Sequence, residues 1–405
     1  MKKTARTLIF LLIAALLSCT NPVNNPAKFQ LVSTFAGTGQ EGVQNGAAGV
    51  AQFHNPFGVA TDSSDNVYVA DENNHMIRKI TPQGVVSTYA GTGQAGHRDG
   101  AGVSAQFEFP AGVAVDSSGN VYVADSRNHR IRRITPGGEV STFAGPAGAD
   151  RLSGDRDATG NQARFYNPSG VATDSSGNVY VADYGNHMIR RITPERVVST
   201  LAGSGKAGTT NGIGTQAQFD EPVGVAVFET DNNLIVYVAD TNNHRIRKIA
   251  PQNDGTVMVS TFAGSGQPGT TNGIGTQAQF DEPVGVAVDS SGNVYVADSG
   301  SNRIRKIAPQ NDGTVMVSTL AGTSAQFDNP SGVAVDSSGN VYVADYNNHR
   351  IRKIIPQNDG TVMVSAVAGT SAQFDNPNGV ATDSSGNVVY VADSSNSRIR
   401  KIVYQ

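Results

Sequence analysis

The sequence predicts an all-β protein, a seven-bladed β-propeller of four-stranded blades, and three observations support this prediction. A segment like GVAVDSSGNVYVADSRNHRIRRI, residues Gly112–Ile134, recurs in close variants seven times. A second element, VSTFAG and its variants, also occurs seven times. The two sets are out of phase, because VSTFAG stands alone at Val32–Gly37 while the last long unit, Gly379–Ile402, has no VSTFAG after it. The simplest interpretation is a ring in which this N-terminal outer strand completes the last blade.

Each unit contains four strand signals. The first strand reads GVAVD or GVATD in most units, the second NVYVAD, the third RIRKI and the fourth VSTFAG. The usual link between the first two, Asp-Ser-Ser-Gly-Asn, suits a hairpin turn because glycine accepts positive φ and aspartate can accept hydrogen bonds from the following amides. The second strand is apolar at consecutive positions, as at Val121–Ala124, which indicates burial on both faces. A propeller buries each blade in this way between its two neighbours.

The length and composition fit one large radial domain, which we place at residues 29–405. The chain has 405 residues, 46 glycines and no tryptophan, and the repeat argues against several separate domains. No stretch of 18 or more apolar residues follows the N-terminus, so we expect no internal transmembrane helix.

The first 18 residues have the features of a lipoprotein signal peptide. Lys2, Lys3 and Arg6 precede a ten-residue apolar stretch, Leu8–Leu17, which is too short to span a bilayer. Leu-Leu-Ser-Cys, ending at Cys19, resembles the bacterial lipobox, and Cys19 is the only cysteine in the chain. We therefore expect a lipid on Cys19, a tether over residues 19–28 and a place in the bacterial cell envelope, facing the periplasm or the cell exterior. An ordinary secretory signal with an incidental cysteine is the alternative.

Charge and cysteine content narrow the function classes. Removing residues 1–18 takes away three of the 30 basic residues and none of the 34 acidic ones, which lowers the net charge from −4 to −7. A mildly acidic exported protein is a poor candidate for nucleic-acid binding, so we expect the lipid to be its only membrane contact. Without a cysteine beyond Cys19, ring closure has to hold the fold in place of disulfides.

The turn between the second and third strands resembles the NHL repeat family, which is named for an asparagine-histidine-leucine stretch. The matching residues are Asn-His-Arg-Ile at Asn128–Ile131, and the flanking Pro-x-Gly-Val-Ala and Val-Ala-Asp elements fit as well. The same Asn-His pair occurs in phase at Asn74-His75, Asn186-His187, Asn243-His244 and Asn348-His349. Arginine or methionine stands where the family name has leucine. Many family members have six blades, which is the alternative here, but seven complete sets favour seven.

Several charged positions recur once per unit. An aspartate ends the second strand seven times, with arginine seven positions later in all seven units, which predicts a ring of internal Asp–Arg hydrogen bonds. Five histidines hold the same turn position in different blades, too far apart to share a zinc ion, so we expect a structural role. An aspartate ends the first strand in six units and is expected to cap its turn, while unit four has Phe228 there. Calcium or zinc capture by these aspartates on the channel axis is the alternative.

The sequence nominates no catalytic residue and no metal ligand. The first strands contain no histidine, and the chain has no G-x-S-x-G, H-E-x-x-H or C-x-x-C-H motif. We therefore expect a monomeric binding scaffold for a protein or glycan partner. The resemblance also implies an alternative, because some NHL-like propellers are lyases or lactonases with a divalent metal in the central channel.

The expected binding surface is the face that carries the long links between blades. Links such as Ser204–Gln218 and Ser265–Gln279 are rich in Gly, Thr, Asn and Gln, and strand alternation places them beside the Asn-His turns. The last two units have short links, so we expect a cup that is tall on one arc, with a partner docked against that arc. The candidate binding residues are Asn128, His129, Asn211, Asn243, His244 and Asn272.

Overall fold

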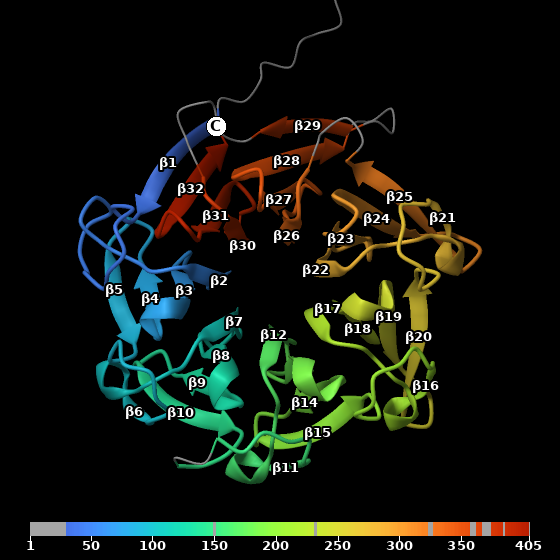
Figure 1. Cartoon of the computed structure of the whole chain (residues 1–405), viewed down its shortest axis with the longest axis horizontal. Coiled ribbons are helices and arrows are strands. Elements are labelled where there is room, and N and C mark those ends of the chain that lie inside the picture. Colours follow the sequence, from blue (N-terminus) through green and yellow to red (C-terminus); the bar gives the residue numbers. More distant parts are fainter. Residues whose placement is uncertain are drawn as a thin grey trace, which may run out of the picture.

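The chain folds into a ring of seven blades around a central channel, as predicted (Figure 1). The computed structural model describes residues 30–148, 151–230, 233–322, 327–356, 362–366, 374–383 and 385–404. The six-blade alternative is wrong. No helix in these ranges is long and apolar enough to cross a membrane. Cys19 and the predicted signal peptide and tether lie outside the described residues.

Blades are numbered here in chain order, and each is given from its inner to its outer strand. Blade 1 contains β2 (Pro56–Thr61), β3 (Val67–Asp71), β4 (Met76–Ile80) and β5 (Val86–Ala90); blade 2 contains β7 (Pro110–Val115), β8 (Val121–Asp125), β9 (Arg130–Ile134), β10 (Glu139–Ala144) and β6 (Gly100–Ala101). Blade 3 contains β12 (Pro168–Thr173), β13 (Val179–Asp183), β14 (Met188–Ile192), β15 (Val197–Ala202) and β11 (Ala158–Thr159); blade 4 contains β17 (Pro222–Thr230), β18 (Asn233–Asp240), β19 (Arg245–Pro251), β20 (Val257–Ala263) and β16 (Gly212–Ile213). Blade 5 contains β22 (Pro283–Val288), β23 (Val294–Asp298), β24 (Arg303–Pro309), β25 (Val315–Ala321) and β21 (Gly273–Ile274); blade 6 contains β26 (Pro330–Val335), β27 (Val341–Asp345), β28 (Arg350–Pro356) and β29 (Val362–Ala366). Blade 7 contains β30 (Pro377–Thr382), β31 (Val388–Asp393), β32 (Arg398–Tyr404) and β1 (Gln30–Ala36).

Short 3-10 helices occupy two recurring places. Four lie in the turns between second and third strands: η1 (Glu72–Asn74), η3 (Ser126–Asn128), η5 (Tyr184–Asn186) and η7 (Thr241–Asn243). Four lie in the links before blades 2 to 5: η2 (Gly102–Ser104), η4 (Gly160–Gln162), η6 (Gly214–Gln216) and η8 (Gly275–Gln277).

The N-terminal strand β1 closes the ring, which confirms the prediction from the phase of the repeats. It pairs antiparallel with β32, with Gln30 opposite Tyr404 and Thr34 opposite Arg400. In Figure 1 this blue strand lies beside the red C-terminal strands. The last blade therefore joins the two ends of the described chain.

The hydrophobic core is divided among the seven blade interfaces. The cluster between blades 7 and 1, for example, combines Phe35 and Tyr390 with Val67 and Val69. Both faces of each second strand are buried, as its consecutive apolar residues predicted. Each blade is therefore stabilised by its neighbours more than by a core of its own.

A glycine in each inner strand permits the close approach of neighbouring blades. A Cβ on Gly112 would overlap the carbonyl oxygen of Ser169, and one on Gly379 would overlap that of Phe57 across the closure. The same holds for Gly58, Gly170, Gly224, Gly285 and Gly332. The sequence shows these glycines only as part of the GVAVD element, whereas in the structure they allow the inner strands to pack around the channel.

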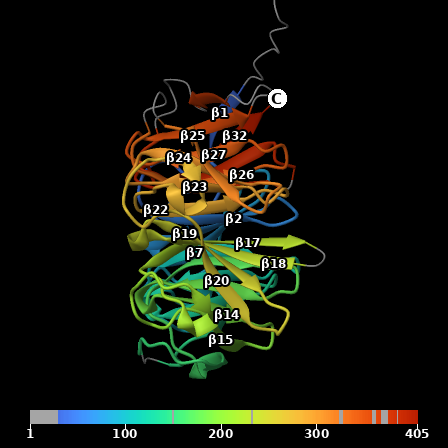
Figure 2. The ribbon, with the colours of Figure 1, turned by 90° about the vertical axis from the view of Figure 1, so that its right-hand side faces the viewer.

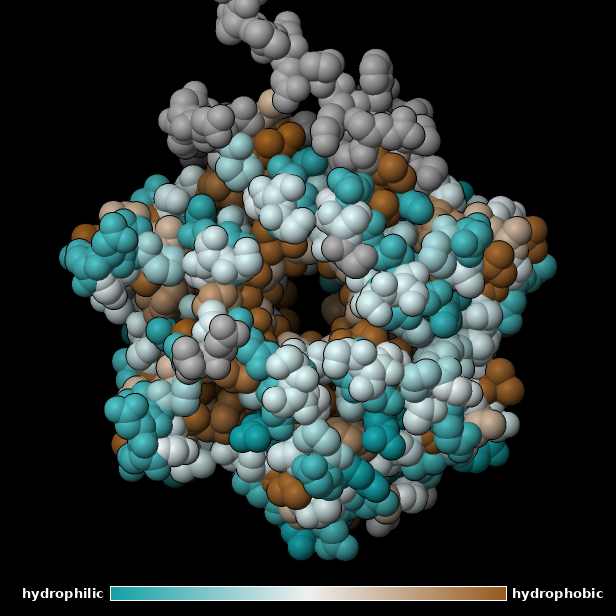
Figure 3. Space-filling model, turned by 180° about the vertical axis from the view of Figure 1, so that it is seen from behind, coloured by the Kyte–Doolittle hydropathy of each residue, from teal (hydrophilic) through white to brown (hydrophobic). Residues whose placement is uncertain are grey.

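The disc has two unlike faces. The loop face carries the turns between second and third strands and the links between blades; the opposite face carries the other hairpin turns. Figure 2 shows the disc from its side, with the long hairpin of β17 and β18 projecting beyond it on one side. In Figure 3 the channel opens at the centre of one face, and its wall is mostly hydrophobic.

Candidate functional site

A buried ion-pair network lies beneath the loop face in every blade. In blade 2, Asp125 accepts hydrogen bonds from the Glu108 backbone amide (2.7 Å) and from Nη1 of Arg132 (2.8 Å). Both charged side chains are fully buried, and the guanidinium lies 4.8 Å from the ring centre of Phe107. The seven Asp–Arg pairs are Asp71–Arg78, Asp125–Arg132, Asp183–Arg190, Asp240–Arg247, Asp298–Arg305, Asp345–Arg352 and Asp393–Arg400. The predicted internal ring of Asp–Arg bonds is confirmed, and we call it the framework.

Burial is the main influence on the pKa values of the framework carboxyl groups. It raises the pKa of all seven, to about 6 for Asp183, Asp298 and Asp393, and the arginines and amide donors oppose part of that rise. Because every described carboxylate in this set is already bonded, the framework has a structural role.

Five blades have a turn histidine, and each of these histidines connects its blade to the next. His129 adopts the left-handed conformation (φ 55°), and its Nδ1 accepts a hydrogen bond from the Asn167 backbone amide in blade 3 (3.1 Å). His75, His187, His244 and His349 accept in the same way from the following blade. Blade 5 has Asn302 in this position, and its Oδ1 accepts from the Asn329 amide (2.7 Å). The predicted structural role is confirmed, and the link to the next blade is an addition to it.

Four of the predicted binding residues are hydrogen-bonded within the protein. Nδ2 of Asn128 donates to the Asp125 carboxylate and to the carbonyl of Gly96, and Asn243 bonds in the same way. Oδ1 of Asn211 accepts from Arg247 (2.8 Å), and Oδ1 of Asn272 accepts from Arg305 (2.9 Å).

The other two candidates, His129 and His244, accept the backbone bonds described above. The structure thus places all six residues in contacts that hold links and blades together. Their role in binding a partner stays a prediction.

The long links do more than connect blades. After crossing the loop face, the links before blades 2 to 5 each add a short fifth strand at the outer edge, as where Gly100–Ala101 pairs with β10. Two-residue strands leave no periodic pattern, so the sequence did not indicate them. The short links before blades 6 and 7 lie largely outside the described residues.

The aspartates at the ends of the inner strands cap their own turns. Asp116 accepts from the Ser118 and Asn120 backbone amides and from the Tyr122 hydroxyl, and corresponding turn bonds occur at Asp62, Asp174, Asp289, Asp336 and Asp383. Among the described residues, no three His, Cys, Asp or Glu side chains gather closely enough to hold a metal ion.

The variable residues of the loop face lie at the mouth of the channel. Each inner strand follows a Phe-x-x-Pro sequence, and we call its two middle residues the mouth pair. The mouth pairs are His54–Asn55, Glu108–Phe109, Tyr166–Asn167, Asp220–Glu221, Asp281–Glu282, Asp328–Asn329 and Asp375–Asn376. The first residue of each pair donates its amide to the framework aspartate. The second is left-handed, with φ between 45° and 52°.

The mouth pairs divide the loop face into two arcs. Blades 1 to 3 form an aromatic arc, in which Phe109 is 37% exposed and Tyr166 43% exposed. The ring of Phe109 lies 4.9 Å from that of His75, and Tyr166 lies 5.5 Å from His129. Blades 4 to 7 form an acidic arc of Asp220, Glu221, Asp281, Glu282, Asp328 and Asp375. The sequence could have indicated these positions, because they vary within an otherwise constant segment.

Comparison with known proteins identifies the repeat. The "NHL repeat" model matches residues 53–80, 107–134, 327–354 and 374–402, and the "Teneurin NHL domain" model matches residues 163–329. The chain is 31% identical over 287 residues to Protein SUPPRESSOR OF QUENCHING 1, chloroplastic, of Arabidopsis thaliana, covering 67% of this chain and 26% of that protein. It is 30% identical over 300 residues to NHL repeat-containing protein 2 of Bos taurus, covering 65% of this chain and 40% of that protein. The chain thus spans less than half of either relative.

Solved structures share the fold at low sequence identity. Virginiamycin B lyase from Staphylococcus aureus matches with a TM-score of 0.59 and 13% identity, covering 93% of this chain and all of the other. An auxiliary nutrient binding protein from Bacteroides thetaiotaomicron matches with a TM-score of 0.55 and 17% identity, covering 93% and 77%. Likeness at these identities concerns the arrangement of the blades and no individual site residue.

Proposed function

Since the chain is an NHL-repeat β-propeller, we propose that it is a binding scaffold that captures a protein or glycan partner on its loop face. We further propose that it is a monomer attached to the bacterial cell envelope by a lipid on Cys19. The attachment rests on the basic and apolar residues before Cys19.

One observation carries the binding proposal: the seven blades share their framework, whereas their mouth pairs take five different forms, with Asp-Glu in blades 4 and 5 and Asp-Asn in blades 6 and 7. A fold supports many functions, and recognition belongs to the residues displayed on it. Exposed aromatic side chains are suited to the centre of a protein interface or to the apolar face of a sugar ring. The carboxylates of the acidic arc can accept hydrogen bonds from hydroxyl groups or pair with a basic group. We place the partner across the channel mouth, in contact with both arcs.

The alternative is a propeller enzyme, a lyase or lactonase with a divalent metal in the channel. The fold likeness to virginiamycin B lyase is compatible with it, but at 13% identity that likeness assigns no residue of this chain to catalysis. Metal analysis of the purified protein distinguishes the two, because a tightly bound stoichiometric divalent ion would favour the enzyme.

The binding proposal is tested by removing the aromatic arc while keeping the fold. The double variant F109S/Y166S should reduce capture of the native partner at least tenfold, in cross-linking pull-downs for a protein and on an array of envelope glycans for a sugar. Val103 is 65% exposed in η2, so V103S is a matched control that should leave capture unchanged. Undiminished capture by a correctly folded F109S/Y166S protein would place the site elsewhere.

The anchor has its own test. The variant C19A should move the protein from membranes into the soluble extracytoplasmic fraction. A protein that is exported, cleaved and still membrane-bound after salt washing would contradict lipid attachment at Cys19.

A further inference from the structure

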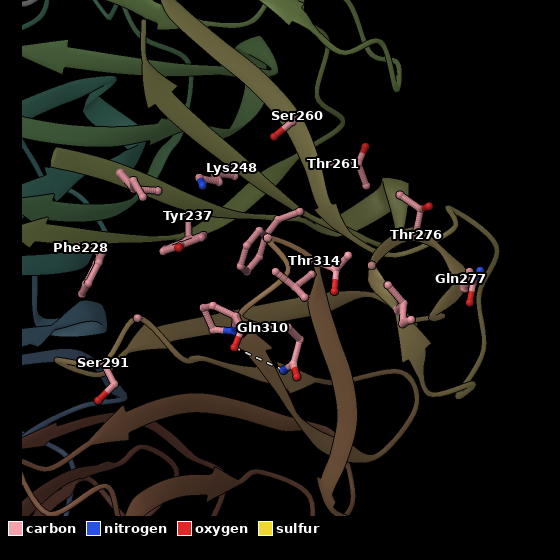
Figure 4. A pocket seen from close by; sticks show the side chains of 18 residues that line it. Phe228, Tyr237, Lys248, Ser260, Thr261, Thr276, Gln277, Ser291, Gln310 and Thr314 are labelled. Atoms are coloured by element: carbon pink, nitrogen blue, oxygen red, sulfur yellow. Dashed lines mark hydrogen bonds between the residues drawn. The ribbon is translucent and has the colours of Figure 1, made fainter.

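A cavity of about 610 Å³ lies between blades 4 and 5, lined by hairpin turns of the opposite face and, at the outer edge, by Ile274–Gln277 of the link before blade 5. Figure 4 shows Phe228, Tyr237 and Lys248 on the blade 4 side, with Ser291 and Gln310 on the blade 5 side. Its volume is in the range of small-molecule sites. None of the residues predicted to bind a partner lines it.

The cavity exists where blade 4 departs from the repeat. In blades 1, 2, 3, 5 and 6, the tyrosine of the second strand donates its hydroxyl to the aspartate that ends the first strand, at 2.9–3.1 Å. Blade 4 has Phe228 in place of that aspartate, and β17 and β18 continue beyond it to Thr230 and Asn233. Tyr237 is only 2% exposed, and among the described residues its hydroxyl has no hydrogen-bond partner. Blade 4 therefore keeps the donor, which lines the cavity, and lacks its acceptor.

A single cation stands beside this hydroxyl. Tyr237 and Lys248 are directly opposed on β18 and β19, so their side chains lie on the same face of the sheet. Lys248 is the only charged residue in the described lining and forms no ion pair with a described carboxylate. Burial raises the pKa of Tyr237 to about 12, which keeps its hydroxyl protonated at neutral pH. The wall thus presents an ammonium group and a neutral donor where other blades supply a carboxylate.

The neighbouring groove between blades 3 and 4 is an internal comparison. It is smaller, about 280 Å³, and Asp174 and Tyr180 both line it. There the tyrosine hydroxyl donates to Asp174 at 2.9 Å. The position of the anion is occupied in that groove by the protein's own side chain.

The rest of the cavity wall combines serine, threonine and glutamine side chains with a group of apolar ones. Phe228, Ile235 and Phe262 line the blade 4 side, and Ile274 and Val315 complete the wall. A Cβ on Gly292 would lie 3.4 Å from the ring of Phe228, which therefore reaches the turn of blade 5. A ligand here can bury an apolar group while its charged end meets Lys248.

We propose that this cavity binds a small apolar monocarboxylate, an aryl- or alkyl-carboxylic acid. Its carboxylate accepts hydrogen bonds from Tyr237 and Lys248 and takes the place of the aspartate that blade 4 lacks. Its apolar part packs between Phe228 and Phe262. None of the mouth pairs lines the site, so partner capture at the channel mouth is not affected by its loss.

Calorimetric titration with 3-phenylpropionate tests the proposal, with the uncharged 3-phenylpropionamide as the matched probe. We expect saturable binding of the carboxylate and at least about tenfold weaker binding of the amide, because a charge-assisted bond is lost. Y237F and K248M should each weaken carboxylate binding about tenfold. F228D, which returns a carboxylate to the wall, should abolish it.

The control is Y295F in blade 5, which removes the same hydroxyl where Asp289 already accepts it. It should leave the affinity unchanged, and thermal unfolding of each variant verifies the fold. Three outcomes would overturn the proposal: no saturation by the wild type up to about 10 mM, equal binding of acid and amide, or unchanged affinity in folded K248M.

Discussion

The framework and the mouth pairs are neighbours in sequence, but the framework residues are the same in all seven blades while the mouth pairs vary. Phe107 packs on the framework arginine and Pro110 begins the inner strand, while Glu108 and Phe109 between them differ from the residues of every other blade. In the framework the same aspartate and arginine recur seven times and are bonded to each other. The mouth pairs share their backbone conformation and hydrogen bonds in all seven blades, but their side chains take five different forms. The difference teaches that the constant residues of the repeat build the ring, and that the variable pair between them gives the two arcs of the loop face different surfaces.

The largest expected effect comes from opening the ring on which the whole framework depends. Deleting residues 30–37 removes β1, exposes the edge of β32 and takes Phe35 out of the core between blades 7 and 1. We expect loss of the cooperative thermal transition, a loss comparable with the whole free energy of unfolding of a domain, about 5–15 kcal/mol, together with aggregation through the open edge. Calorimetry and size-exclusion chromatography measure both.

Deleting residues 20–26 is the control, because it leaves β1 intact. Equal stability of the two deletion proteins would contradict a shared seventh blade.

A smaller effect on stability is expected from single substitutions, which compare a framework residue with a mouth-pair residue directly. R247M leaves the buried Asp240 carboxylate without its cation, which should lower the free energy of unfolding by about 3–5 kcal/mol. E282Q changes one exposed carboxylate of the acidic arc and should change it by less than about 0.5 kcal/mol. Urea denaturation measures both variants. Similar changes in the free energy of unfolding for R247M and E282Q would mean that the framework is no more important to stability than the mouth pairs.

Much of the fold was predictable because the sequence elements that form it recur in every blade. The count of seven, the closure by Val32–Gly37 and the Asp–Arg pairs all follow from elements that recur at fixed spacing, and the structure confirms them. Contacts within one repeat unit are visible in this way, because both partners recur together.

Contacts between units were not predictable from the spacing. The Asn167 amide donates to Nδ1 of His129, which lies 38 residues earlier in the preceding blade. The sequence around neither residue indicates this contact. Asn211 and Asn272 were predicted as binding residues because amides in long loops suit hydrogen bonding, yet each accepts from an arginine more than 30 residues away. The cavity beside Phe228 required the positions of Tyr237 and Lys248, which the sequence shows only as members of two strands.

The smallest effect concerns the links between blades and depends on pH. Burial lowers the pKa of His75 and His129, and each Nδ1 must be unprotonated to accept the amide of the next blade. The unfolded imidazoles, with a pKa near 6.5, therefore take up protons before the folded ones. The stability that these two residues contribute is present above about pH 6.5 and is lost as the pH falls through their lowered folded pKa values. H75N/H129N should keep both bonds, as Asn302 does in blade 5, and should reduce the fall in unfolding free energy between pH 7 and 5 by about 1 kcal/mol or less for each histidine. The reciprocal variant N302H should add pH dependence in blade 5, and parallel stability–pH curves for the wild type and both variants would show that the links do not titrate.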